Sequence, residues 1–347
     1  MTAHQSNSPQ ESAPSVLTLD LSGSLESSRL LVEDLAQQAP HWPAFARVLS
    51  RGEWLAPGPS IPQIPSPAPL ALLGEGEDPA DAFWLRADPV HLRPDQDFLL
   101  LWDASALDLS DEEARQLAET FNGHFQADGF LLKTPAPGRW YLRCASTIEG
   151  ETTPVDEVTG RNIAHFMPRG KDCQRLAQLM NETQMLFHEH PVNQARAASG
   201  QWTVSGVWPW GGGRLPPAEP HDGLTIFSDD PLHRGLARWQ SATAHAVPGD
   251  YDQWKLRAGQ RNLVRLDQPA IPARHGDGPA WQTALADIEN RWLLPALADG
   301  QSLLLNLGRL GRVRYAPSMG WRFWRRSRPL WYWLTVTLDQ TSDESTQ

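Results

Sequence analysis

Basic and amide side chains of the types that bind anions are spread between positions 86 and 196. The set comprises Arg86, His91, Arg93, Arg143, His190, Asn193 and Arg196. Arginine presents a fork of N–H donors that matches phosphate or carboxylate, and a neutral imidazole adds a further hydrogen bond. The sequence therefore predicts a pocket for a small phosphorylated or carboxylate metabolite. The alternative is a structural network in which these residues pair with Asp88, Asp103 and Glu189.

The histidines do not form an obvious metal site. His188 and His190 are two positions apart, which on a helix points their rings about 200° away from each other. His233 follows Asp229 by four positions, a spacing that could chelate a metal on one helical face, unless Asp229 is an N-cap outside the helix. We predict a structural use for His188 and His190, and no metal and no cofactor.

Composition restricts the class of protein. The 347 residues suffice for two domains, or for one large domain that carries an insertion. The formal charge of −11 disfavours nucleic acid as a partner. Cys144 and Cys173 are too few for a disulfide framework, which indicates a reducing compartment. The start of the chain is polar and its apolar runs are short, so we expect a cytoplasmic protein that makes no membrane contact.

The first part of the chain alternates regular elements with a proline-rich break. Val16–Leu21 has the alternation of a strand, with a helix expected after it, and Pro43–Leu55 has the spacing of a second helix. Prolines recur through Pro57–Pro69, which we interpret as an extended linker or surface loop. Residues 1–15 and 339–347 carry too little apolar surface to order themselves, so both are predicted to be disordered tails.

The middle of the chain predicts an α+β module. Strands are expected at Phe83–Arg86 and Phe98–Trp102. Ser110 and Glu113 form the pattern of a capping box at the start of a helix. The remaining expected elements are a hairpin of Phe130–Lys133 with Arg139–Arg143, followed by a helix at Asp172–His188.

Sixteen tryptophans are many for this length, and several lie near the C-terminus. The segments Leu303–Leu307, Val313–Ala316, Trp321–Trp324 and Leu330–Val336 are predicted to form a β-meander. We expect its aromatic side chains to pack in a core, with a protein-binding patch as the alternative. Aromatic and basic residues also alternate here in a way that suits nucleobases or an anionic membrane, but we predict neither partner.

Two segments resemble the archaeal type of cofactor-independent phosphoglycerate mutase. They are the run from His188 through His190-Pro191-Val192-Asn193 to Arg196, and Trp208-x-Trp210-Gly211-Gly212-Gly213. The resemblance covers about 83–213 and extends weakly into 223–239. Together with Ala87–Leu92, the same segments are similar more narrowly to bacterial regulatory proteins of the RpfE type.

The resemblance implies an α/β fold. An alkaline-phosphatase-like sheet domain would be formed by 16–82 and 214–338, with the α+β module inserted at 83–213. In that superfamily an Asp after the first strand binds metal and a Ser or Thr is the nucleophile, assisted by two cations. At the corresponding place this sequence has Asp20 and Ser22, a pattern that is also ordinary turn chemistry.

The later ligand segments of that superfamily match poorly. His275-Gly276-Asp277-Gly278 has the inverse order of the expected Gly-His-x-x-Asp pattern, and no carboxylate follows Leu303–Leu307 until Asp339. We therefore expect a non-catalytic regulatory or binding protein without catalytic residues. It would bind a metabolite, or a protein partner through the tryptophan-rich C-terminal region. The alternative is a metal-dependent phosphoglycerate mutase or phosphomonoesterase that uses Mn or Zn.

Overall fold

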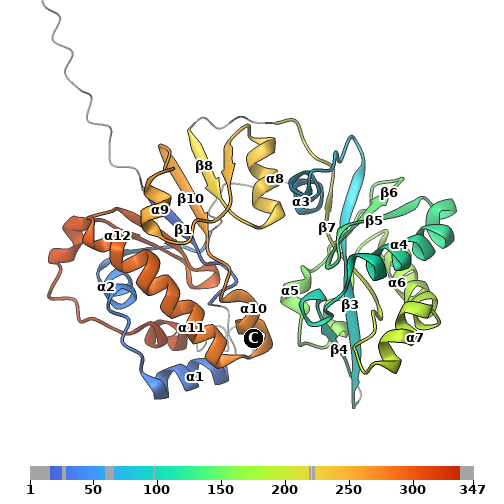
Figure 1. The fold of residues 1–347 in the computed structure, drawn as a ribbon, viewed down its shortest axis with the longest axis horizontal. Helices are drawn as coiled ribbons and strands as arrows, with labels where there is room; N and C mark the ends of the chain where they lie inside the picture. The colour runs from blue at the N-terminus through green and yellow to red at the C-terminus, as the bar shows by residue number, and fades with distance from the viewer. Residues whose placement is uncertain are drawn as a thin grey trace, which may run out of the picture.

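The structure, a computed structural model, describes residues 16–25, 29–58, 66–96, 98–218, 220 and 223–336. Both predicted tails and the prolines at 59, 62 and 65 lie outside these residues. The chain forms two lobes, each built around one sheet (Figure 1). In the described residues no helix is long and apolar enough to cross a membrane.

The first lobe contains a seven-stranded sheet with the order β2-β12-β11-β1-β10-β8-β9. Its strands are β1 (Leu17–Asp20), β2 (Glu53–Leu55), β8 (Leu224–Phe227), β9 (Thr243–His245), β10 (Arg261–Arg265), β11 (Leu303–Asn306) and β12 (Arg312–Tyr315). The five strands from β11 to β9 run parallel, whereas β12 pairs antiparallel with both β11 and the edge strand β2. Parallel strands are covered on both faces, which explains the continuous apolar run of β11.

Alternate residues of the sheet enter two different cores. Phe227 and Val264 join a large core with helices α1 (Arg29–Gln38), α2 (Pro43–Arg51), α11 (Gly278–Ile288) and α12 (Leu294–Ala298). Ile226 and Leu263 point to the opposite face and pack against α8 (Pro231–Trp239). A short helix, α9 (Tyr251–Lys255), completes the large core.

A buried carboxylate fixes the start of α2. Glu289, which is 1% exposed, lies in the π-helical turn between α11 and α12. Its two oxygens accept the N–H groups of Ala44 and Phe45 at 2.6 and 2.9 Å. Burial raises the pKa of Glu289, and these two backbone donors oppose the rise. Glu289 therefore supplies the cap that the preceding residue, Trp42, does not provide.

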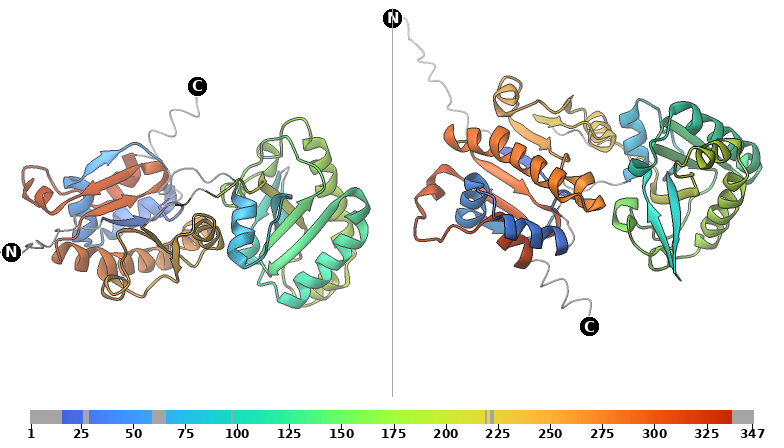
Figure 2. Two further views of the ribbon diagram at one scale, coloured as in Figure 1. Left: turned by 90° about the horizontal axis from the view of Figure 1, so that it is seen from above. Right: turned by 60° about the horizontal axis from the view of Figure 1, so that its bottom comes forward.

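The second lobe contains a five-stranded sheet with the order β4-β3-β6-β5, and β7 pairs with β3. Its strands are β3 (Phe83–Asp95), β4 (Phe98–Trp102), β5 (Phe130–Ala136), β6 (Arg139–Cys144) and β7 (Gly206–Gly213). Helices α4 (Asp111–Phe125), α6 (Cys173–His188) and α7 (Pro191–Ala198) contribute to its core, and the short helix α5 (Val155–Val158) lies beside β4. The views in Figure 2 show the helices gathered around this sheet.

The two lobes meet where α3 (Pro67–Glu75) crosses α8. A Cβ atom added at Gly74 would lie 1.7 Å from the carbonyl oxygen of Pro231, and one at Gly235 would lie 1.7 Å from that of Leu70. Only glycine lets the two backbones approach so closely. The same helix α3 also contacts β3 and β7, so it connects both lobes.

Several sequence predictions are confirmed. The fold class is α/β, with an α+β module inserted between strands of the larger sheet. The capping box is present, since Ser110 accepts the N–H of Glu113 and Glu113 accepts that of Ser110. The predicted hairpin is β5 with β6, and the predicted helix at 172–188 is α6. The exact domain boundaries stay a prediction.

Other predictions are wrong. The helix expected over 43–55 ends at Arg51, because Gly52 is extended and leads into β2, which pairs with β12. The expected linker is helical from Pro67, because proline is compatible with a first helical turn.

The expected meander stops after β12. Residues 317–321 form a 3₁₀ helix, and residues 330–336 are helical. Leu330 and Leu334, four positions apart, are the buried residues of that last helix. Of the aromatic residues expected in the core, Trp321, Phe323 and Trp324 are exposed instead.

Candidate active site

Asp20 lies at the carboxyl end of the central strand β1 and is 3% exposed. Its Oδ1 accepts the Ser22 N–H at 3.0 Å, the Ser22 hydroxyl at 2.7 Å and the Asn306 amide at 3.1 Å. Asn306 ends the neighbouring strand β11. The carboxyl edge of a parallel sheet is the usual place for a ligand in α/β proteins. Two segments distant in the sequence, residues 20–22 and the end of β11, therefore orient one carboxylate there.

Arg265, the last residue of β10, places a positive charge beside the Ser22 hydroxyl. Its Nη1 donates to Ser22 Oγ at 2.5 Å and lies 3.3 Å from Asp20 Oδ2. The hydroxyl oxygen thus lies between a carboxylate that can take its proton and a cation that stabilises its negative charge. Such an arrangement activates a serine as a nucleophile.

A histidine and a second carboxylate approach the same point from α8. Asp230 is the N-cap of α8 and accepts the Leu232 N–H at 2.9 Å. His233 Nδ1 lies 3.2 Å from Asp230 Oδ2, and its Nε2 lies 3.8 Å from Asp20 Oδ2. Burial acts to raise the pKa of Asp230, but the bond and charge of His233 and the Leu232 N–H outweigh it and lower that pKa. Asp230 therefore stays ionised and orients the imidazole.

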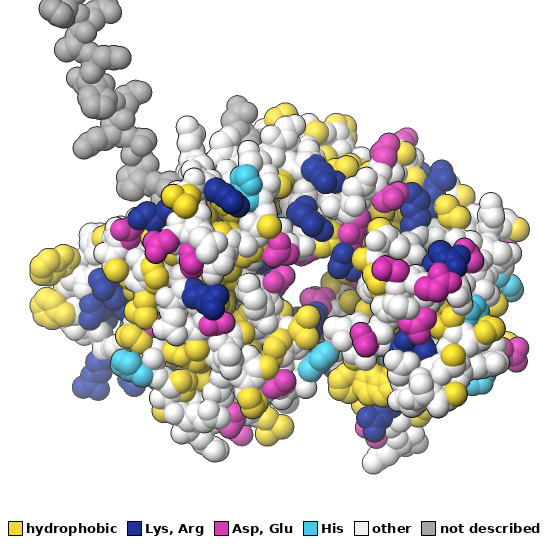
Figure 3. Space-filling model, viewed as in Figure 1, with side chains coloured by type: hydrophobic (Ala, Val, Ile, Leu, Met, Phe, Trp, Pro, Cys, Tyr) yellow, Lys and Arg dark blue, Asp and Glu magenta, His cyan; other side chains and the backbone are white. Residues whose placement is uncertain are grey.

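The opposite lobe faces this site. Figure 3 shows an opening between the lobes with acidic and basic side chains on its borders. From the second lobe the charge of Arg86 interacts with that of Asp230. Burial is the largest influence on the pKa of Arg86 and acts to lower it, but the charge and hydrogen bond of Asp88, together with the charges of Tyr141 and Asp230, outweigh burial and raise that pKa. Asp267 lies close enough to Arg265 and Asp230 for their charges to affect it, and burial raises the pKa of its carboxyl group.

The donor set of this site does not fit a two-metal centre. In the part of the chain that the structure describes, no group of three or more His, Cys, Asp or Glu side chains is arranged to hold a metal ion. The carboxylate of Asp20 is engaged by Ser22, Asn306 and Arg265. Arg265 thus supplies a fixed positive charge near the hydroxyl.

Asp20, Asp229, His233, His275 and Asp277, the residues compared above with metal-ligand patterns, do not all come together. Asp20 and His233 lie in one site, as described above. Asp229 is next to the actual N-cap of α8, which is Asp230 and not Asp229. Asp277 instead caps α11 by accepting the Ala280 N–H at 3.0 Å.

His275 joins the lobes at a second place. It ends α10 (Ala270–His275), and its Nε2 lies 3.1 Å from the Ser105 hydroxyl of the second lobe. Asp103 accepts the Ser105 backbone N–H at 2.9 Å and lies 3.8 Å from the same imidazole nitrogen. Arg274 lies 3.9 Å from the other oxygen of Asp103. These contacts hold α10 against the loop after β4.

Arg86 is enclosed within the second lobe and does not project freely. It is 9% exposed, forms an ion pair with Asp88, and lies over the rings of Tyr141 and Trp210 at 4.9 and 5.3 Å. Asp88 also accepts the indole N–H of Trp210 at 2.8 Å. Arg86 therefore has its own carboxylate partner in the absence of a ligand.

Three more members of the basic set lie inside the second lobe. His190 is the N-cap of α7, and Asn193 donates to the carbonyl oxygens of Phe187 and Val204. Arg196, at 2% exposure, donates to Glu113 at 2.8 Å, to the Trp202 carbonyl at 2.7 Å, and to the Leu107 carbonyl. These bonds form a structural network, but its partners are Glu113 and backbone carbonyl groups. Among the described residues, only Asp88 of the carboxylates expected for the alternative pairs with a member of the set, which is Arg86.

The remaining members lie elsewhere. His91 contacts the carbonyl oxygen of Thr203 at 2.9 Å and stacks on Trp202. Arg93 and Arg143 are exposed, on β3 and β6. The seven residues thus do not form one pocket, and binding of an anion by any of them stays a prediction.

Sequence reasoning missed Asp230, Arg265 and Asn306. Each ends or closely follows a short apolar strand of the parallel sheet, as Asp20 does. A search for polar residues at strand ends would have found them. Their convergence depends on the strand order, which brings β11, β1, β10 and β8 side by side.

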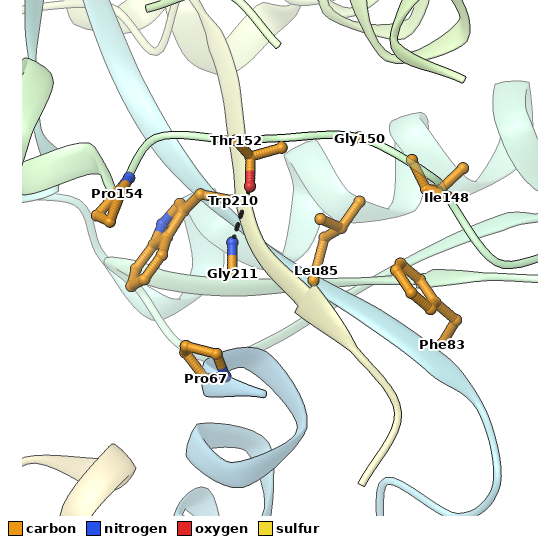
Figure 4. A pocket seen from close by; sticks show the side chains of 10 residues that line it. Pro67, Phe83, Leu85, Ile148, Gly150, Thr152, Pro154, Trp210 and Gly211 are labelled. Atoms are coloured by element: carbon orange, nitrogen blue, oxygen red, sulfur yellow. Dashed lines mark hydrogen bonds between the residues drawn. The ribbon is translucent and has the colours of Figure 1, made fainter. Parts of the chain in front are cut away.

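A separate cavity of about 360 Å³ lies in the second lobe near α3 (Figure 4). Its lining is mainly apolar and includes Pro67, Phe83, Leu85, Ile148 and Trp210. The hydrogen bond from the Gly211 N–H to Thr152 Oγ1, 3.2 Å long, is among the few polar contacts in this wall. No charged side chain lines it, so this cavity is unlike the site around Asp20.

Comparison with known proteins relates the chain to one family. Residues 71–193 match the family described as 2,3-bisphosphoglycerate-independent phosphoglycerate mutase. A protein of Geobacter sulfurreducens, named as a probable mutase of this kind, is 31% identical over 182 residues, which is 49% of this chain and 44% of that protein. A mutase of Methanosarcina mazei is 27% identical over 218 residues, 57% of this chain and 55% of that protein. The chain spans about half the length of these curated relatives.

A solved structure, the cofactor-independent phosphoglycerate mutase of Thermoplasma acidophilum, has 16% identity and a TM-score of 0.40. It aligns with 88% of this chain and 90% of its own. By its match over residues 71–193 and its curated relatives, the chain is a divergent relative of the 2,3-bisphosphoglycerate-independent mutases.

These matches correct two sequence predictions. The expectation of a non-catalytic regulatory or binding protein is wrong, because the relatives are named as mutases. That expectation relied on missing carboxylates late in the chain, whereas Asp230, through His233, and Arg265 lie in one charged cluster with Asp20 and Ser22. The expectation of no cofactor is contradicted by the metal dependence that is typical of the matching family, although the described residues of this chain hold no cluster of three or more metal-ligating side chains.

Proposed function

We propose that the chain catalyses phosphoryl transfer on a small phosphorylated acid, with phosphoglycerate as the substrate. The observation that carries this proposal is the position of the Ser22 hydroxyl between Asp20 and Arg265. The names of the relatives support the choice of phosphoglycerate. We also propose that the chain is related to the narrower RpfE-type group. A cytoplasmic location is a further proposal, which the two free, buried cysteines support.

The proposed first step forms a phosphoserine. The Ser22 oxygen attacks phosphorus while its proton passes to Asp20 Oδ1, 2.7 Å away. The bond from phosphorus to the substrate oxygen breaks, and His233, held by Asp230, is placed to protonate the leaving oxygen. Arg265 stabilises charge on the transferred group.

In the second step the phosphoryl group leaves Ser22. A mutase returns it to the other hydroxyl of the same three-carbon acid, and Ser22 recovers its proton. If water were the acceptor, the same site would act as a phosphomonoesterase. Closure of the site by the second lobe, which faces Asp230 with Arg86, would favour the mutase by excluding water.

The test is the interconversion of 3- and 2-phosphoglycerate by the purified chain, supplied with manganese, magnesium or zinc. We expect turnover of about 1 per second or faster, the low end for ordinary enzymes. Ser22→Ala should abolish it, whereas the matched control Ser199→Ala, on the exposed end of α7, should not. Absence of both interconversion and phosphate release, or full activity of Ser22→Ala, would refute the proposal.

A further inference from the structure

Three aromatic side chains project into solvent from one short segment near the C-terminus. Trp321, Phe323 and Trp324 are 78%, 77% and 69% exposed, and we refer to them as the aromatic tip. The rings of Phe323 and Trp324 contact each other edge to face, with centroids 5.5 Å apart. The segment projects from the first lobe, at the far left of Figure 1, and it stays at the edge of the molecule in Figure 2.

The backbone that carries the aromatic tip is held firmly. Arg51, at the end of α2, donates to the Gly320 carbonyl at 2.5 Å, and Arg322 donates back to the Arg51 carbonyl at 3.0 Å. Arg325 donates to the Gly52 carbonyl at 3.1 Å. Binding through the tip would therefore cost little ordering of the chain, because the loop is already fixed.

The segment that carries the tip has a charge opposite to that of the chain as a whole. Positions 320–330 contain four arginines and no Lys, Asp or Glu, namely Arg322, Arg325, Arg326 and Arg328. The complete chain has a formal charge of −11. An anionic surface would thus attract this end of the molecule and repel the rest. The protein would therefore approach such a surface with the aromatic tip facing it.

We propose that the aromatic tip docks the protein on an anionic lipid surface. Tryptophan prefers the boundary between headgroups and acyl chains, and arginine pairs with lipid phosphates. The tip is a projection from the edge of the lobe, which suits insertion into a soft planar surface (Figure 2). Single-stranded nucleic acid instead requires a groove along which bases stack. The proposal departs from the expectation, drawn from composition, that the chain makes no membrane contact.

The experiment measures sedimentation of the full chain with vesicles. Phosphatidylcholine vesicles containing about 30% phosphatidylglycerol should bind the protein at least about tenfold more tightly than pure phosphatidylcholine vesicles. Changing Trp321, Phe323 and Trp324 together to Ala should weaken that binding by more than about tenfold. The matched control is Leu256→Ala, because Leu256 is 86% exposed but lies far away in sequence, and it should bind like the parent.

The triple variant should keep the parent's melting temperature, since side chains this exposed contribute little to folding. An unchanged melting temperature with weakened binding supports the proposal. No binding of the parent to anionic vesicles would overturn it, as would equal binding to both vesicle types. It would also be overturned if the triple variant lost affinity for a single-stranded oligonucleotide or an acidic protein while its vesicle binding stayed unchanged.

Discussion

Replacing Arg196 with methionine removes a buried guanidinium at the centre of the second lobe. Methionine retains much of the apolar stem, so the change mainly deletes hydrogen-bond donors. The carbonyl groups of Trp202 and Leu107 would lose their partners, and Glu113 would lose its ion pair. The variant therefore tests whether Arg196 stabilises the fold or binds a ligand.

The expected loss of stability follows from these contacts. Each buried carbonyl left unpaired costs about 1–3 kcal/mol. Glu113 is partly exposed, so water can replace part of its lost bond. The total loss should be about 3–5 kcal/mol, as is usual when one partner of a buried ion pair is removed.

Urea unfolding followed by fluorescence checks the expectation. Arg93→Met is the control, because Arg93 is exposed on the same lobe, and it should change the unfolding free energy by less than about 0.5 kcal/mol. The reasoning would be refuted if Arg196→Met unfolded like the parent but bound a phosphorylated three-carbon acid about tenfold more weakly. That pattern would show that Arg196 serves an anion pocket.

Three other changes have defined outcomes. Arg265→Met should lower kcat by about a hundredfold or more, because the charge beside Ser22 Oγ is lost, and retention of the parent's kcat would exclude that role. Burial lowers the pKa of His190 below its ordinary 6.5, so on acidification the unfolded chain binds a proton at a higher pH than the folded chain does. The free energy of unfolding should therefore fall as the pH drops below 6.5. His190→Asn keeps an acceptor for the Val192 N–H and should remove this pH dependence in urea titrations at several pH values. Gly235→Ala should lower the free energy of unfolding by more than about 3 kcal/mol, because the added Cβ would lie 1.7 Å from the Leu70 carbonyl oxygen. An unchanged melting temperature in calorimetry would contradict this packing of α3 on α8.

Local patterns in the sequence predicted the elements whose signals are local. The capping box at Ser110 and the hairpin around Pro137 each depend on residues a few positions apart. Leu330–Val336 was wrongly predicted as a strand, because a short apolar run fits a strand or a buried helix equally well. The structure places Leu330 and Leu334 on one buried helical face.

The candidate site was only partly predictable, because its residues come from four distant segments. Asp20 and Ser22 were recognisable after a strand, and His233 was considered for its spacing. Arg265 and Asp230 were not predicted as site residues, since only the order of the strands in the sheet brings them near Asp20. Arg196 was noticed but given the wrong expected role, because the sequence around an arginine does not distinguish one that binds an anion from one that is bonded within a buried network.

Rapid acid quenching followed by mass spectrometry tests the central claim most directly. The chain would be mixed with 3-phosphoglycerate and a divalent cation, quenched during turnover and digested. One phosphoryl group should be found on the peptide that contains Ser22, and Asp20→Asn should lower its amount because the proton acceptor 2.7 Å from the hydroxyl is lost. Turnover without any phosphoryl group on Ser22, or with the group on another residue, would contradict the account.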